Sequence, residues 1–141
     1  MKTKEILQQY RKGKRDFNSL QLRECFLSWE SLREINLSYA NLSLAILEGA
    51  DLTEASLFKA NLFRADLTAA NLHKADLFGA DLRVSDLRGA ELTYANLLCA
   101  DLRGASLVGA DLSNAIMPDG TIMSDRYIVH DRKELAFVDV Y

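Results

Sequence analysis

The sequence predicts an all-β solenoid, a chain that winds into a stack of similar coils, and three observations carry this prediction. Residues 16–115 divide into twenty consecutive five-residue words, such as NLFRA at 61–65. The second residue of the word is Phe17 once and leucine in all nineteen later words. The fifth residue is alanine in fifteen of the sixteen words that end between Ala40 and Ala115, with Ser85 as the exception.

A five-residue period excludes both a helix and a flat strand. At about 100° per residue, every fifth leucine advances by roughly 140°, so the leucines would cover the whole surface of a helix. Within a word the apolar Ala-x-Leu pair fits one face of a strand, but the next pair comes three residues later. A bend must absorb the extra residue. Each word is therefore one short extended side followed by one turn.

The predicted interior is narrow, because large leucines and small alanines alternate along its lining and pack without voids. Burying one leucine contributes roughly 1.5–3 kcal/mol of transfer free energy, so the leucine column is the expected core. We select five of its members as the core ladder: Leu37, Leu57, Leu67, Leu77 and Leu97.

The words NLSYA at 36–40, NLFRA at 61–65, DLTAA at 66–70 and DLRGA at 101–105 resemble the pentapeptide-repeat family. The family pattern is Ala, then Asp or Asn, then Leu, then two variable residues, and it covers 100 of the 141 residues. The resemblance implies a right-handed quadrilateral parallel β-helix with four words per coil, hence about five coils. Right-handed winding agrees with the general rule for parallel crossovers. The close of the repeats resembles small cyanobacterial members.

Four words per coil define four walls, each built from every fourth word. Wall one begins its words at residues 16, 36, 56, 76 and 96, and walls two, three and four begin theirs 5, 10 and 15 residues later. Phe58 and Phe78, twenty residues apart, then lie on the same wall. The same holds for Phe26 and Ile46, the apolar residues at the first word position.

Three parts are expected along the chain. Residues 1–15 form a short helix that caps the open end of the core, with Thr3 as its N-cap and Gly13 as its stop. Ile6, Leu7 and Tyr10 share one face. The alternative for this basic segment is an anionic or nucleic-acid contact. Residues 16–115 form the β-helix. Residues 116–141 form a turn and a tail that caps the last coil or dimerises.

The irregular positions yield further expectations. The first coil has Leu20, Cys25, Glu30 and Ile35 where later coils have alanine. We expect Glu30 to turn outward or to lie at the open edge of the coil, with Trp29 folded over this irregular position. Glycine recurs at the fourth position, which indicates a type II turn with positive φ. Words with Ala69, Lys74 or Val84 there are expected to use another turn.

The tail carries two apolar stretches. Residues 127–129 and 136–141 favour short extended pieces joined by the polar residues 131–134, and a helix over 132–138 is the alternative.

Residues of the kinds used in catalysis are few. His73 and His130 are the two histidines, and neither has the sequence context of a triad, a metal site or a phosphate loop. We therefore expect no enzyme activity, cofactor, metal or small-molecule substrate, and no membrane or nucleic-acid binding. Cys25 points inward and Cys99 outward, so they do not pair, and free thiols favour the cytoplasm.

Function is expected on the outer surface. Wall one is nearly uncharged, and the candidate partner surface comprises Tyr39, Phe58, Phe63, Phe78 and Leu98. One hypothesis is a scaffold or protein-interaction module, with a second copy or another protein as partner. The alternative is a modulator of a DNA-handling enzyme such as gyrase, which mimics duplex DNA through the acidic wall four. A third option is a scaffold without a dedicated partner.

Overall fold

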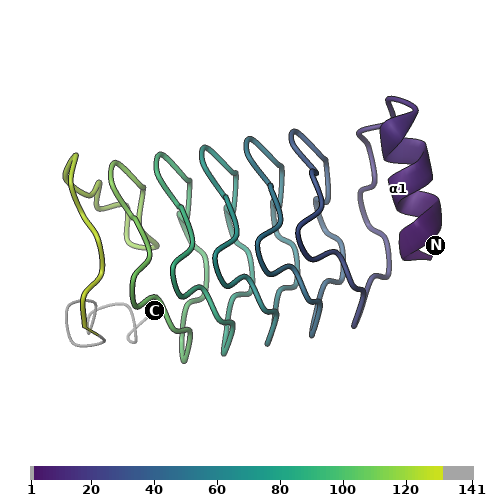
Figure 1. The fold of residues 1–141 in the computed structure, drawn as a ribbon. Coiled ribbons are helices and arrows are strands. Elements are labelled where there is room, and N and C mark those ends of the chain that lie inside the picture. The colour runs from purple at the N-terminus through teal and green to yellow at the C-terminus, as the bar shows by residue number, and fades with distance from the viewer. Residues whose placement is uncertain (1, 132–141) are drawn as a thin grey trace.

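The computed structural model describes residues 2–131, and it shows one α-helix followed by a stack of coils (Figure 1). Helix α1 spans Thr3–Arg11 and lies at the N-terminal end of the stack. Parallel bridges of single residues join positions twenty apart, from Asp16 with Asn36 to Asn96 with Ile116. Four bridges join each coil to the next, so residues 16–115 form five coils with four walls. The predicted twenty-residue coil is confirmed.

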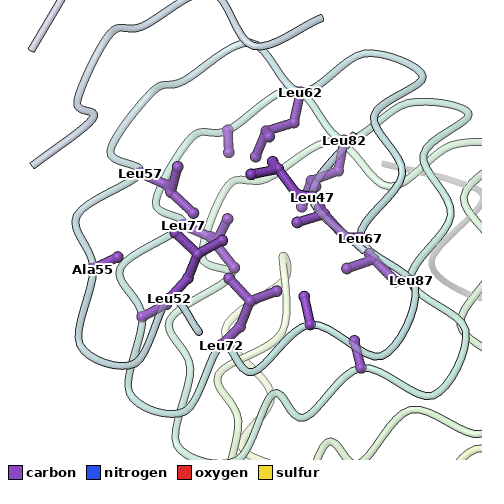
Figure 2. Close-up of a cluster of buried hydrophobic side chains, with 14 of the residues drawn as sticks. Leu47, Leu52, Ala55, Leu57, Leu62, Leu67, Leu72, Leu77, Leu82 and Leu87 are labelled. Atoms are coloured by element: carbon purple, nitrogen blue, oxygen red, sulfur yellow. The ribbon is translucent and has the colours of Figure 1, made fainter. Parts of the chain in front are cut away.

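Leucine and alanine fill the interior of the coils. The five leucines of the core ladder are completely buried, as are most of their counterparts on the other walls. Figure 2 shows leucines from successive coils pointing into the same interior space. Ser85 replaces alanine at one buried position, and its hydroxyl donates a hydrogen bond to the Leu82 carbonyl at 2.7 Å. The exception is therefore accommodated without an unsatisfied polar atom.

Every word uses the same turn, whatever residue stands at its fourth position. All twenty fourth residues have positive φ, between 51° and 79°. The expectation of a different turn at Ala69, Lys74 and Val84 was wrong. The reason is the ladder between coils: the Val84 N–H, for example, donates to the Arg103 carbonyl at 3.0 Å. Because this ladder fixes the backbone, it overrides the reluctance of a β-branched residue to adopt positive φ.

Asp or Asn at the first position satisfies an amide that has no backbone acceptor. In each of the thirteen words that begin with Asp or Asn, the side-chain Oδ1 accepts the N–H of the third residue at 3.0–3.2 Å. The other amides of a regular word donate to backbone carbonyls. Asp and Asn suit this position because their side chains are short enough to bond the main chain two residues further on.

Helix α1 closes the first coil. Ile6 is completely buried in the core, and the Tyr10 hydroxyl donates to the Arg33 carbonyl at 2.8 Å, an edge group of the first coil. Glu30 lies partly exposed and pairs with Arg11 at 3.5 Å. Thr3 is not the N-cap: Lys2 holds that position without a side-chain hydrogen bond.

Trp29 of the first coil reaches the next coil. Its indole lies over Gly49, so close that a Cβ at Gly49 would stand 2.1 Å from the ring.

Beyond the last coil the chain reverses direction. After a turn at Pro118–Gly120, Ile122 and Ile128 form antiparallel bridges with Ile116 and Asp111. The expected extended piece at 127–129 is therefore present, while the expectations for 132–141 fall outside the described residues. Walls one, three and four of the last coil thus form backbone hydrogen bonds with residues 116–129. On wall two, the N–H groups of Leu102 and Gly104 have no acceptor among residues 2–131.

The first prediction concerns the leucine column. Leu67→Ala should lower the free energy of unfolding by about 2–5 kcal/mol, because the coils above and below hold the cavity open. Glu54→Ala, an exposed change at a fourth position, is the control and should cost less than about 0.5 kcal/mol. Urea denaturation measures both. Equal effects of the two substitutions would contradict the central role of the leucines.

The second prediction concerns turn strain. Val84 and Gly104 stack in one column, and Val84 is about half exposed. Val84→Gly should stabilise the protein by up to about 1 kcal/mol, because positive φ costs a non-glycine residue about 1–3 kcal/mol while the added chain entropy of glycine offsets about 0.5–1 kcal/mol. Gly104→Val should destabilise it. Opposite signs in urea denaturation are expected, and a loss of stability in both variants would contradict the account.

Candidate functional surface

Four of the five residues predicted to meet a partner form an outward column on wall one, in which Phe58, Phe78 and Leu98 hold the third word position and Tyr39 holds the fourth, beside Phe58. The rings of Phe58 and Phe78 stack with centroids 5.3 Å apart and planes 10° from parallel. Tyr39 meets Phe58 edge-on at 5.6 Å and is itself 57% exposed. Leu98 continues the column toward Gly120. Phe58, Phe78 and Leu98 are half-buried, because each covers part of its neighbour.

Phe63 lies apart from this column. It belongs to wall two, where the guanidinium groups of Arg64 and Arg83 lie 5.4 and 5.3 Å from its ring centroid. Arginine over an aromatic face is a favourable cation–π arrangement. The structure therefore does not place Phe63 in the column, and its ring serves the local packing of wall two.

Aspartate–arginine pairs within single words are a feature that the sequence interpretation missed. In three DLR words, Arg83, Arg88 and Arg103 bind Asp81, Asp86 and Asp101 at 2.7, 2.6 and 2.6 Å. The hydrogen bond from each guanidinium lowers the pKa of its aspartate, against the opposing effect of burial. The spacing Asp-Leu-Arg was the available signal, because it places both side chains outward in the same word.

These pairs also change the electrostatic character of walls two and three. Asp81 and Asp101 stack in successive coils and repel each other, and Arg83 offsets this repulsion because its Nε also lies 3.9 Å from the Asp101 carboxylate. Each carboxylate is compensated locally by its own arginine. The column of aspartates is therefore not a continuous row of uncompensated negative charge.

Wall four carries the one histidine of the coils. His73 Nδ1 lies 2.6 Å from the Thr93 hydroxyl, and that hydroxyl donates to Glu91 at 3.2 Å. The carboxylate contacts the threonine and not the imidazole, so the three side chains do not have the order of a catalytic triad. Residues 2–131 contain no group of three or more potential metal ligands.

The two cysteines are free, as expected. Burial raises the pKa of the Cys25 thiol to about 11, which makes this inward thiol unreactive. Cys99 is exposed on wall one.

A second outward apolar group lies near the N-terminal end and was not predicted as a contact surface. Phe26 and Trp29 are 68% and 69% exposed. Phe26 forms a bridge with Ile46 in the next coil, and Trp29 lies over Gly49. The signal in the sequence was the replacement of Asp or Asn by Phe26 and Ile46 at the first position.

Comparison with known families agrees with this geometry. The family model for pentapeptide repeats, which spans eight copies of the word, matches residues 31–68, 45–83 and 85–119. The chain belongs to the pentapeptide-repeat family. A comparison with curated protein sequences gives no match.

Several solved structures are similar. A pentapeptide repeat protein from the Arabidopsis thaliana thylakoid lumen is 29% identical with a TM-score of 0.70, and the match covers 72% of this chain and 70% of that chain. A pentapeptide repeat protein from the cyanobacterium Nostoc PCC 7120 is 33% identical over 89% of this chain and 88% of that chain, with a TM-score of 0.35. QnrB1, a plasmid-mediated fluoroquinolone resistance protein, is 24% identical with a TM-score of 0.61, over 71% of this chain and 54% of that chain.

These comparisons concern the family and the fold. Pentapeptide repeat proteins are generally structural or interaction modules, and at the identity of QnrB1 the likeness concerns the fold alone. Within residues 2–131, no helix has the length and apolarity that crossing a membrane requires.

The third prediction concerns acid stability. Asp81, Asp86 and Asp101 have lowered pKa values in the folded protein, so their contribution to stability is full above the unfolded aspartate value of about 3.9. It is lost as the pH falls below that value. Replacing all three by Asn keeps the Oδ1 acceptors and removes the titration. The thermal midpoint of the variant should therefore fall less steeply between about pH 5 and pH 2. If the thermal midpoints of the variant and of the unaltered protein fell equally with pH, the proposed contribution of the three aspartates to stability would be contradicted.

Proposed function

We propose that the coils wind as a right-handed quadrilateral β-helix and that this protein is a non-enzymatic scaffold. A protein partner docks on wall one. The single observation that supports the proposal best is the outward column of Tyr39, Phe58, Phe78 and Leu98. Contiguous apolar surface on a small protein commonly marks a contact site. The partner is a second copy or a different protein. The free thiols Cys25 and Cys99 support a reducing compartment such as the cytoplasm.

The folding of the coils does not require this column. On the other walls the third position mostly holds polar or charged residues, with Phe63 and Val108 as the apolar exceptions, and the backbone there has the same turns and ladder. The aromatic side chains do contribute stacking, which is worth about 0.5–1.5 kcal/mol for a ring pair. Yet Tyr39 remains 57% exposed at the end of the column, so much apolar surface is left for a partner.

The alternative function, mimicry of duplex DNA, has weaker support. Three aspartates, Asp81, Asp86 and Asp101, form ion pairs with arginines of their own words. Asp51 on wall four also pairs, with Arg33 at 3.4 Å. A DNA mimic needs a long field of one sign, and these arginines interrupt it.

The fourth prediction tests the column on wall one. Phe58→Ser combined with Phe78→Ser should abolish self-association or partner capture, because it removes the two stacked rings at the centre of the apolar surface. The circular dichroism spectrum should stay largely unchanged. Sedimentation velocity and pull-down from the source cell measure the association. The matched control is Val108→Ser, which removes an outward apolar side chain from the third position of wall three and should leave association intact.

Two results would count against the proposal. The first is an unfolded double variant, which would make the column a stabilising ladder. The second is unchanged association. Inhibition or protection of gyrase supercoiling at micromolar protein, lost when Glu54, Glu91 and Asp111 are neutralised together, would instead support mimicry.

A further inference from the structure

Phe26, Ile46 and Trp29 form a second apolar surface, on wall three of the first two coils, which we name the wall-three patch. Phe26 is 68% exposed and stands over Ile46, with which it forms a bridge. The Trp29 indole lies flat against the backbone at Gly49, in the same word as Ile46. The patch thus presents two aromatic side chains and one aliphatic side chain to solvent.

Local folding does not account for the apolar residues of the patch. The first position of a word normally holds Asp or Asn, whose Oδ1 accepts the third N–H. Phe26 and Ile46 have no such acceptor, and the N–H groups of Ser28 and Glu48 have no hydrogen-bond acceptor among residues 2–131. Among residues 2–131, the five words that begin with Gln, Ser or Glu lack this bond as well, but only the words of Phe26 and Ile46 place an apolar side chain at the first position. Residues that break the repeat pattern without a benefit to folding are expected at binding sites.

The charges around the patch indicate what it binds. Glu48 is exposed, lies in the same word as Ile46 and has no ion pair within the described chain. Asp66 stands directly above Ile46, joined to it by the next bridge. Among the basic groups, Arg11 pairs with Glu30, and Arg88 pairs with Asp86 and also interacts electrostatically with Asp66. An apolar centre with an acidic rim is complementary to an apolar side chain flanked by lysine or arginine.

We propose that the wall-three patch is a docking site for a protein segment in which aromatic or aliphatic anchors are flanked by basic residues. The anchor packs on Phe26, Ile46 and the face of Trp29, and the basic side chains meet Glu48 and Asp66. Aromatic residues are the typical anchors of such contacts. The site is separate from the wall-one column, so it does not depend on the function proposed above.

The sole tryptophan of the chain reports on this site directly. The probe is an acetylated, amidated peptide with two lysines on each side of a central pair of phenylalanines. Two control peptides replace the lysines by glutamates or the phenylalanines by serines. We expect the first peptide to shift the Trp29 emission to shorter wavelength in a saturable way. Both control peptides should need at least a tenfold higher concentration for half-saturation.

Variants connect the response to the patch. Phe26→Asn with Ile46→Asn should weaken binding at least tenfold, yet its thermal midpoint should be no lower than that of the unaltered protein, because each Asn restores an Oδ1 acceptor. Glu48→Gln with Asp66→Asn should weaken binding about threefold, and more at low salt than at high salt. Phe58→Ser on wall one is the matched control and should leave the peptide response unchanged.

Three results would overturn the proposal. Equal responses to the three peptides would show that binding lacks the expected chemistry. An unchanged response in the Phe26→Asn and Ile46→Asn variant would place binding elsewhere. A lower thermal midpoint in that variant would show that the two apolar residues serve folding.

Discussion

The regular words depend on an acceptor for the N–H of the third residue, which Asp or Asn at the first position supplies in thirteen of the twenty words. The first, second and fourth amides bond to neighbouring coils and the fifth closes the turn, so the third alone lacks a backbone partner. A short side chain at the first position supplies it, as Asn61 does for Phe63 at 3.0 Å. A buried or crowded amide without a partner costs about 1–3 kcal/mol. Asp and Asn at this position therefore have a structural reason that is independent of charge.

In words that begin with Asp or Asn, the first, second and fifth residues are committed to the backbone and the core, so the third and fourth are the residues most available for recognition. The fourth must adopt positive φ, and the structure shows that the ladder imposes this on lysine, valine and tyrosine as well as on glycine. Side-chain identity at these two positions is therefore weakly restricted by the fold. A solenoid of this kind carries its contacts on columns of outward side chains, since its interior is filled with leucine and alanine.

The sequence was sufficient to predict the five-residue word, because its pattern of leucine and alanine recurs twenty times. The coil of four words came from the resemblance to the pentapeptide-repeat family and from the twenty-residue spacing of Phe58 and Phe78. The sequence was not sufficient to predict the turn at Val84, because a local conformational preference competes there with hydrogen bonds to Arg103 in another coil. The same limit applies to Phe63, which the sequence places on the neighbouring wall and which was nevertheless included in the candidate partner surface. Its surroundings are set by Arg64 and by Arg83 of the next coil, and their conformations follow from contacts across coils.

The two apolar surfaces differ in how far the protein itself covers them. On wall one, Phe58 and Phe78 cover each other, so part of their apolar area is already removed from water before any partner arrives. A partner there gains less new burial, but it meets a surface whose side chains are already ordered, which lowers the entropic cost of binding. On the wall-three patch, Phe26 and Trp29 are more than two-thirds exposed, so a partner gains more apolar burial. The acidic rim at Glu48 and Asp66 then determines which partner can use it, because a segment with acidic flanks would be repelled.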